Sequence, residues 1–221
     1  MDVPQDSFLT IESAIRGGSI ALFSNGKLIA SRVGDGDRSR SEDLLPDIAE
    51  MLDEAGVTAA RLERVIVSRG PGSFTGIRIG IATALGLGDS LAIPVIGVSL
   101  FEVIGRSSND RGNGIVVAPI GRNDLAWQRF EDGSPATDLG NISPRAGSVD
   151  EFLISVCESK IANIHCHSSI REALEGRLDA GVKTIEIGPN LAEIVGNSIL
   201  RGDEYSFSLE PIYVSNSTLR A

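Results

Sequence analysis

The chain has 221 residues, of which 20 are basic and 30 acidic, so its formal net charge at neutral pH is −10. A surface of this sign repels phosphate backbones, so we expect any nucleic acid to be engaged only indirectly, through a partner protein. No apolar run is long enough to span a membrane, the first residues do not form a signal peptide, and two cysteines give no disulfide framework, so a cytoplasmic protein is expected.

The chain opens with three predicted strands. Residues 8–12 form an apolar run, and residues 19–23 and 27–33 flank the pair Asn25-Gly26. This pair favours the type I′ turn of a two-residue β-hairpin, because both of its residues adopt positive φ readily. We therefore predict a hairpin directly after the first strand.

A helix is predicted over residues 42–55, after a loop rich in glycine and charged residues. Pro46 has no N–H to donate inside a helix, so we expect it in the first turn, and Gly56 is placed to end the helix. One face of the helix is apolar and comprises Leu44, Leu45, Ile48, Leu52 and Ala55.

A glycine-rich turn joins a predicted strand at 64–68 to a helix over 76–90, and a strand over 94–98 follows. Gly70-Pro71-Gly72 makes the corner, and Ser73 or Thr75 can cap the helix with a side-chain oxygen.

Two interpretations of the corner stay open. Its backbone N–H groups could hold an anion such as a phosphate, an interpretation that Arg69 and Arg78 keep open. Alternatively it is a tight turn without a ligand, which the absence of a P-loop lysine and of Rossmann glycine spacing favours.

Small residues recur at every fourth position of the helix over 76–90. A glycine inside a helix costs about 1 kcal/mol relative to alanine. Gly80 and Gly86 therefore indicate that another part of the protein comes very close to this helix, either the chain's own sheet or another subunit. The recurring small residues are Gly76, Gly80, Ala84 and Gly88.

A polar linker over 107–114 precedes a second series of elements. Strands are predicted at 115–118, 125–131, 161–165 and 183–187, and helices near 148–160, 169–179 and 189–201. The repeated order indicates a pseudo-duplicated α/β chain with two mixed sheets flanked by helices. We divide it into a first lobe, residues 1–106, and a second lobe, residues 107–221.

The segment GPGSFTGIRIGIATALGL, residues 70–87, closely resembles the signature of the TsaB (YeaZ) family, and the resemblance is strongest over residues 8–105. It implies the two-lobed fold shared by actin, the sugar kinases and the Hsp70 ATPase. It also implies a non-catalytic subunit of the complex that forms N6-threonylcarbamoyladenosine at position 37 of tRNAs reading codons that start with A.

The resemblance implies particular partners. They are a TsaD-like catalytic, metal-binding paralogue, which this chain would stabilise, and a TsaE-like ATPase. ATP and a metal would be used there, and this chain would hold no cofactor of its own. In isolation it would form a homodimer.

By analogy with the family, the two helices of the first lobe form the partner interface. Gly76, Gly80 and Ala84 would let a partner helix approach. The expected interface residues are Leu45, Ile48, Leu52, Gly76, Ile77, Gly80, Ile81 and Ala84.

The chain departs from the family pattern at several positions. Glu12 stands where the superfamily carries an aspartate near the nucleotide's metal, and Ser13 stands in a threonine position, while Ala14 replaces a polar residue. The alternative for Glu12, which we favour, is a carboxylate held by neighbouring amides at a strand end. Arg40 replaces a histidine. Candidate anion or nucleotide contacts are Glu12, Ser13, Gly70, Gly72, Ser73 and Thr75.

His165 and His167 flank Cys166 and would share one face of a strand. A third and a fourth ligand are not evident, so we predict no metal site, and we assign no catalytic residue. The alternative is an autonomous enzyme of the same fold, a nucleotide-dependent phosphotransferase or a metallopeptidase-like protein. Such an enzyme would use Glu12, the turn at 70–75 and a carboxylate of the second lobe.

Overall fold

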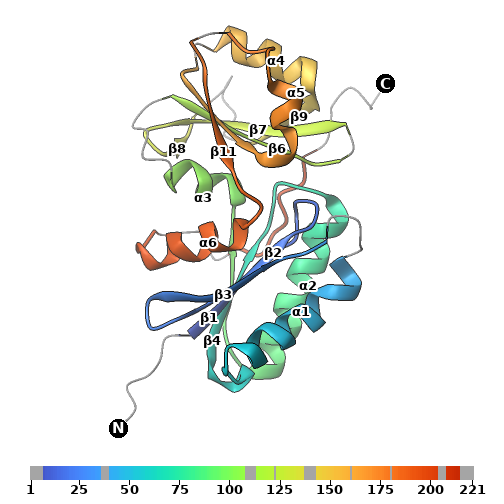
Figure 1. Ribbon diagram of the computed structural model, residues 1–221, viewed down its shortest axis with the longest axis vertical. Coiled ribbons are helices and arrows are strands. Elements are labelled where there is room, and N and C mark those ends of the chain that lie inside the picture. Colours follow the sequence, from blue (N-terminus) through green and yellow to red (C-terminus); the bar gives the residue numbers. More distant parts are fainter. Residues whose placement is uncertain are drawn as a thin grey trace.

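The computed structural model describes residues 7–35, 40–107, 113–121, 123–136, 143–159, 161–179, 181–203 and 208–214. Its strands form two sheets, and helices lie between the sheets and on their outer faces (Figure 1). Within the described ranges, no helix has the length and hydropathy needed to cross a lipid bilayer.

Each half of the chain opens with consecutive strands and continues with alternating helices and strands. The first half contains β1 (Ser7–Glu12), β2 (Ser19–Ser24), β3 (Lys27–Val33), α1 (Arg40–Glu54), the 3-10 helix η1 (Ala59–Arg61), β4 (Leu62–Ser68), α2 (Phe74–Leu91), β5 (Val95–Val98) and α3 (Leu100–Ser107). The second half contains β6 (Gly114–Pro119), β7 (Asp124–Glu131), β8 (Ser134–Pro135), β9 (Arg145–Ser148), α4 (Val149–Glu158), β10 (Asn163–His167), the 3-10 helix η2 (Ser168–Ile170), α5 (Arg171–Leu174), β11 (Lys183–Ile187) and α6 (Leu191–Leu200).

The two sheets repeat one arrangement. In the first sheet, of order β3-β2-β1-β4-β5, β1 pairs antiparallel with β2 and parallel with β4. In the second, of order β11-β10-β6-β7-β8, β6 pairs antiparallel with β7 and parallel with β10. The predicted pseudo-duplicated α/β architecture is therefore confirmed. The predicted hairpin is confirmed as well, since Asn25 and Gly26 have φ values of 52° and 70° between β2 and β3.

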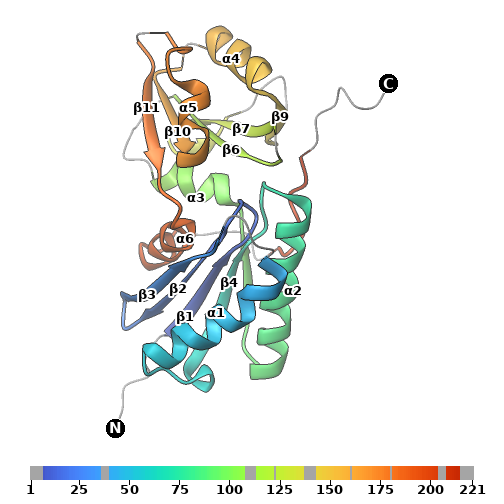
Figure 2. The ribbon, with the colours of Figure 1, turned by 45° about the vertical axis from the view of Figure 1, so that its right-hand side comes forward.

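The helices form three layers around the sheets. Figures 1 and 2 both show α1 and α2 together on the outer face of the first sheet, α6 and α3 between the sheets, and α4 and α5 beyond the second sheet. The middle layer is apolar and continuous, because Phe8 and Phe23 of the first sheet, Phe101 of α3 and Phe130 of the second sheet belong to one buried cluster. This shared core holds the two halves together.

Helix α6 packs on the first sheet although it comes near the end of the chain. The hydroxyl of Thr10 donates to the carbonyl oxygen of Ala192 at 2.9 Å, and the Ala192 N–H donates to Ser19 Oγ at 2.9 Å. A Cβ placed on Gly196 would lie 1.9 Å from Cε2 of Phe23, so the helix backbone rests directly on that ring. The lobe boundary between residues 106 and 107 stays a prediction.

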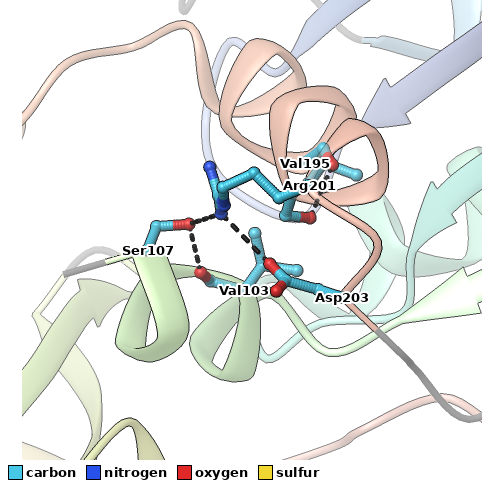
Figure 3. Close-up of polar contacts among 6 residues, drawn as sticks. Val103, Ser107, Val195, Arg201 and Asp203 are labelled. Carbon is cyan, nitrogen blue, oxygen red and sulfur yellow. Dashed lines mark hydrogen bonds and ion pairs between the residues drawn. The ribbon is translucent and has the colours of Figure 1, made fainter. Parts of the chain in front are cut away.

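A polar contact joins α3 to the end of α6, as Figure 3 shows. Nη2 of Arg201 donates to Ser107 Oγ at 2.7 Å and pairs with Asp203 Oδ2 at 3.1 Å. Ser107 in turn donates to the carbonyl oxygen of Val103 at 2.7 Å. The two helices between the sheets are thus joined by hydrogen bonds as well as by apolar packing.

Two predicted helix limits need correction, and one helix was missed. Helix α1 begins at Arg40 and not near Glu42, so Pro46 lies in the second turn. Pro46 is exposed, so the carbonyl oxygen four residues earlier, which lacks its helical N–H donor, can bond to water. The helix predicted over 169–179 is limited to η2 and α5, because the chain turns at Gly176, whose φ is 72°. Helix α3 was not predicted, because its eight residues make only about two turns, too short for a helical period to be recognised in the sequence.

Candidate functional site

The glycine corner between β4 and α2 is built as a helix N-terminus. Ser73 is the cap, and its Oγ accepts from the Gly76 N–H at 3.0 Å, while Thr75 is exposed. Gly70 has a φ of 100°, which a residue with a side chain rarely adopts, and its carbonyl oxygen accepts from the Leu100 N–H at 2.9 Å. The corner thereby ties α2 to the start of α3.

The inner side of the corner is filled by the turn after β1. The Ser73 N–H donates to the carbonyl oxygen of Ala14 at 2.7 Å. A Cβ on Gly72 would lie 2.5 Å from Cβ of Ala14, so glycine is needed for this close contact. These contacts support the interpretation of a tight strand-to-helix turn, because the space and one N–H that an anion would need are used within the chain.

Glu12 and Ser13 are buried and form hydrogen bonds with their own surroundings. Oε1 of Glu12 accepts from the N–H groups of Ala14 and Ile15 at 2.7 and 3.1 Å. The hydroxyl of Ser13 donates to the carbonyl oxygen of Gly76 at 2.8 Å, across the contact with α2. Both side chains thus hold the turn after β1 in place, which is the structural alternative considered for Glu12.

The small residues of α2 face the chain itself. A Cβ on Gly76 would lie 2.0 Å from the carbonyl oxygen of Ser13, and one on Gly80 would lie 2.3 Å from Ser13 Oγ. Ala84 is fully buried. The sequence left open whether the chain's own sheet or another subunit comes close to α2. At these positions the structure shows the chain's own sheet and turn. The expectation that a partner helix approaches at Gly76, Gly80 and Ala84 has to be revised.

The other expected interface residues divide into buried and exposed groups. Ile48, Leu52 and Ile77 are buried, and Ile81 is half-buried, so they contribute to the chain's own core. Leu45 is 55% exposed.

A second exposed leucine and an exposed glycine lie on α2. Leu85 is 46% exposed, and among the described residues no atom beyond the adjoining part of α2 lies within 4 Å of a Cβ built on Gly86. With other exposed residues of the two helices they make up what we call the α1–α2 outer face. It comprises Leu45, Pro46, Ala49, Ala82, Leu85 and Gly86. The sequence singled out Gly86 as a position of close approach but placed neither Gly86 nor Leu85 in the interface, because spacing alone did not show which side of α2 is buried.

His165 and His167 lie on β10, and each is 7% exposed. Nδ1 of His167 accepts from the Ser169 N–H at 3.3 Å and lies 2.8 Å from Ser169 Oγ, while Cys166 belongs to the apolar cluster that includes Phe152. Among the residues that the structure describes, no group of three or more His, Cys, Asp and Glu side chains could hold a metal ion.

Protonation of His167 should reduce stability at acidic pH. Burial lowers the pKa of His167 below its ordinary value of 6.5. Because the unfolded chain then binds the proton more readily, the contribution of neutral His167 is present above pH 6.5 and is lost as the pH falls below it. Urea unfolding at pH 7.5 and pH 5.5 should show a smaller pH-dependent loss for His167→Asn, which keeps a side-chain acceptor for Ser169. Equal losses in the two proteins would contradict this assignment.

Arg40, the residue in place of the family histidine, begins α1, but the side chains of Arg40 and Ser41 lie outside the described residues.

Comparison with known families and proteins gives consistent matches. A family model described as TsaD, tRNA N6-adenosine threonylcarbamoyltransferase, matches residues 35–128. The tRNA threonylcarbamoyladenosine biosynthesis protein TsaB of Escherichia coli strain K12 is 36% identical over 126 residues, which are 56% of this chain and 54% of that protein. The chain spans about half the length of the curated relatives it matches.

Solved structures show the same fold. YeaZ from Pseudomonas aeruginosa aligns with a TM-score of 0.65 at 21% identity, covering 94% of this chain and 99% of that one. A protein of unknown function from Bacteroides thetaiotaomicron, described as having an actin-like ATPase fold, aligns with a TM-score of 0.52 at 10% identity, covering 91% and 97%. The expected two-lobed actin-like fold is confirmed.

Proposed function

Because the chain belongs to the TsaB (YeaZ) family, we propose that it is the accessory, non-catalytic subunit of a complex that forms N6-threonylcarbamoyladenosine in tRNA. Its direct partner is a TsaD-like catalytic paralogue, which it stabilises by covering an apolar surface. A TsaE-like ATPase completes the complex. The protein acts in the cytoplasm.

The observation that carries this proposal is the α1–α2 outer face. Leu45 and Leu85 expose about half of their surface each, on two neighbouring helices whose outer side is covered by no other described helix or strand (Figure 2). Exposed apolar surface on adjacent helices gains free energy when a partner removes it from water. In the absence of the paralogue the same face would pair with a second copy of the chain, giving a homodimer.

Gly86 supports the same location for the interface. A glycine in the interior of an exposed helix costs about 1 kcal/mol relative to alanine. The contacts of Gly76 and Gly80 with Ser13 explain why glycine is needed there, but beyond the adjoining part of α2 no described atom lies within 4 Å of a Cβ on Gly86. A partner backbone or side chain that approaches α2 closely at Gly86 would explain why a glycine is present there.

The charge of the chain supports a proposal that the partner, and not this subunit, binds the tRNA. With a net charge of −10, the subunit as a whole repels phosphate backbones, which disfavours direct binding of nucleic acid. The subunit therefore affects the tRNA only through the catalytic paralogue.

Depletion of the protein should lower the modification. Mass spectrometry of total tRNA nucleosides from depleted cells should show less N6-threonylcarbamoyladenosine than in control cells, and re-expression should restore it. An unchanged amount of the nucleoside, with depletion of the protein verified, would contradict the proposed function and would return attention to an autonomous enzyme.

We infer that the nucleotide and metal used by the complex belong to the other subunits. Glu12, Ser13 and the Ser73 N–H, which would be nucleotide contacts, are used in hydrogen bonds within the chain. Calorimetric titration of the isolated chain with Mg-ATP should therefore give no saturable heat. Saturable binding that Glu12→Gln weakens would contradict this inference and favour a nucleotide-dependent enzyme.

A further inference from the structure

A cluster of two aromatic rings and an arginine lies at the N-terminal end of α2. Phe74 and Arg78 come from the first turns of the helix, and Tyr213 comes from the described segment at 208–214. The guanidinium carbon of Arg78 lies 3.7 Å from the centre of the Phe74 ring. Nε of Arg78 donates to the Tyr213 hydroxyl at 3.0 Å, and the two ring centres are 4.8 Å apart. The three side chains hold one another in a single arrangement.

The segment that carries Tyr213 is itself held against the glycine corner. The Ile212 N–H donates to the carbonyl oxygen of Arg69 at 2.8 Å, and Nη1 of Arg69 donates to the carbonyl oxygen of Glu210 at 3.2 Å. Hydrogen bonds to the backbone of this segment therefore place Tyr213 against α2 without involving its ring. This arrangement fixes the cluster before any partner arrives, which reduces the entropy that binding would cost.

The cluster is exposed. Phe74 is 52% exposed, Tyr213 is 44% exposed, and Arg78 is exposed between them. Tyrosine and arginine are enriched at the positions that contribute most to protein–protein binding, because they combine apolar area with hydrogen-bonding groups. An exposed and already ordered set of such side chains is suited to recognition.

Charge and position indicate what binds there. Among the described residues no carboxylate pairs with Arg78, although the chain carries 30 acidic residues and its net charge is −10. Arg78 also precedes Ala82 and Leu85 at helical spacing, so it continues the α1–α2 outer face toward the N-terminal end of α2.

We propose that Phe74, Arg78 and Tyr213 form a preorganised docking point for an acidic side chain of the TsaD-like paralogue, at one end of the α1–α2 outer face. The proposal rests on the proposed function. The partner's carboxylate pairs with the guanidinium of Arg78, whose plane is kept in place by the Phe74 ring and the Tyr213 hydroxyl. An unstacked nucleobase is a second kind of occupant for such a cluster. Because the net charge of −10 repels the phosphates that accompany a nucleobase, we favour the protein.

The test measures the affinity of the full chain for the TsaD-like paralogue of the same organism by calorimetry. Arg78→Gln removes the charge and keeps most of the side-chain length, and we expect it to weaken binding by about tenfold or more. Lys183→Gln is the matched control, because it removes one exposed positive charge on β11, away from both helices, and it should bind as the wild type does. Both variants should keep the melting temperature of the wild type, since the replaced side chains are exposed.

The outcomes separate this inference from the proposed function. If the wild type binds the paralogue and Arg78→Gln binds equally well, the docking point is wrong while the subunit assignment stands. If the wild type does not bind the paralogue, both are wrong. If Arg78→Gln weakens retention of tRNA in a gel-shift assay and leaves the affinity for the paralogue unchanged, the cluster is an RNA contact and the proposal is overturned. Steeper loss of affinity with salt for the wild type than for Arg78→Gln would support the ion pair.

Discussion

Replacing Leu85 by glutamate should abolish binding of the chain to the TsaD-like paralogue. The Leu85 side chain is 46% exposed on α2, so a carboxylate there stays in water in the free subunit. In the complex the same carboxylate would be buried against an apolar partner surface without a hydrogen-bonding partner, which costs several kcal/mol. A loss of this size reduces the affinity by about a thousandfold, beyond detection in a calorimetric titration.

The control for this experiment is an exposed apolar residue on the other side of the molecule. Ile154 is 59% exposed on α4, outside the second sheet, and Ile154→Glu should bind the paralogue with wild-type affinity. Both variants should unfold in urea within about 0.5 kcal/mol of the wild type, because neither replaced side chain is part of the core. Wild-type affinity of Leu85→Glu would show that the interface lies elsewhere. The variant should also remain monomeric in light scattering under conditions in which the wild type forms a homodimer.

The local features of the first half could be predicted because they depend on neighbouring residues. Asn25-Gly26 specifies a hairpin turn through positive φ values, and Ser73 caps α2 through a hydrogen bond to Gly76, three residues away. The order of strands and helices follows from such local signals and from hydrophobic periodicity. These features determine most of the architecture of the two sheets.

The side of α2 that faces the core could not be predicted, because it depends on distant residues. The Ser13 hydroxyl bonds the carbonyl oxygen of Gly76 across 63 residues of sequence, and no local pattern indicates this pair. A recurrence of small residues is equally consistent with packing against the chain's own turn and against a partner. The same reasoning applies to Tyr213, whose contact with Arg78 spans 135 residues and joins the end of the chain to α2.

A pair of glycine substitutions in the same helix should change stability in opposite directions. Gly76→Ala should lower the free energy of unfolding by about 2–3 kcal/mol, because its Cβ would lie 2.0 Å from the backbone carbonyl oxygen of Ser13 and the turn after β1 would have to move. Gly86→Ala should raise it by about 1 kcal/mol, because nothing lies within 4 Å of the new methyl group and alanine favours the helix. Urea unfolding followed by circular dichroism measures both values.

Substitutions at Gly86 then test whether a glycine of α2 is needed for contact with a partner, and not for packing within the chain. If a partner approaches α2 closely there, Gly86→Ala should stabilise the free subunit and yet weaken its binding to the paralogue, and Gly86→Leu should weaken binding further while the subunit stays folded. A more stable subunit with unchanged affinity for both variants would mean that Gly86 lies outside the contact. In that case Leu45 and Leu85 would have to define the interface without close backbone approach. Destabilisation by Gly86→Ala would instead show that α2 packs differently from the arrangement described, since only a clash can reverse the gain in helix propensity.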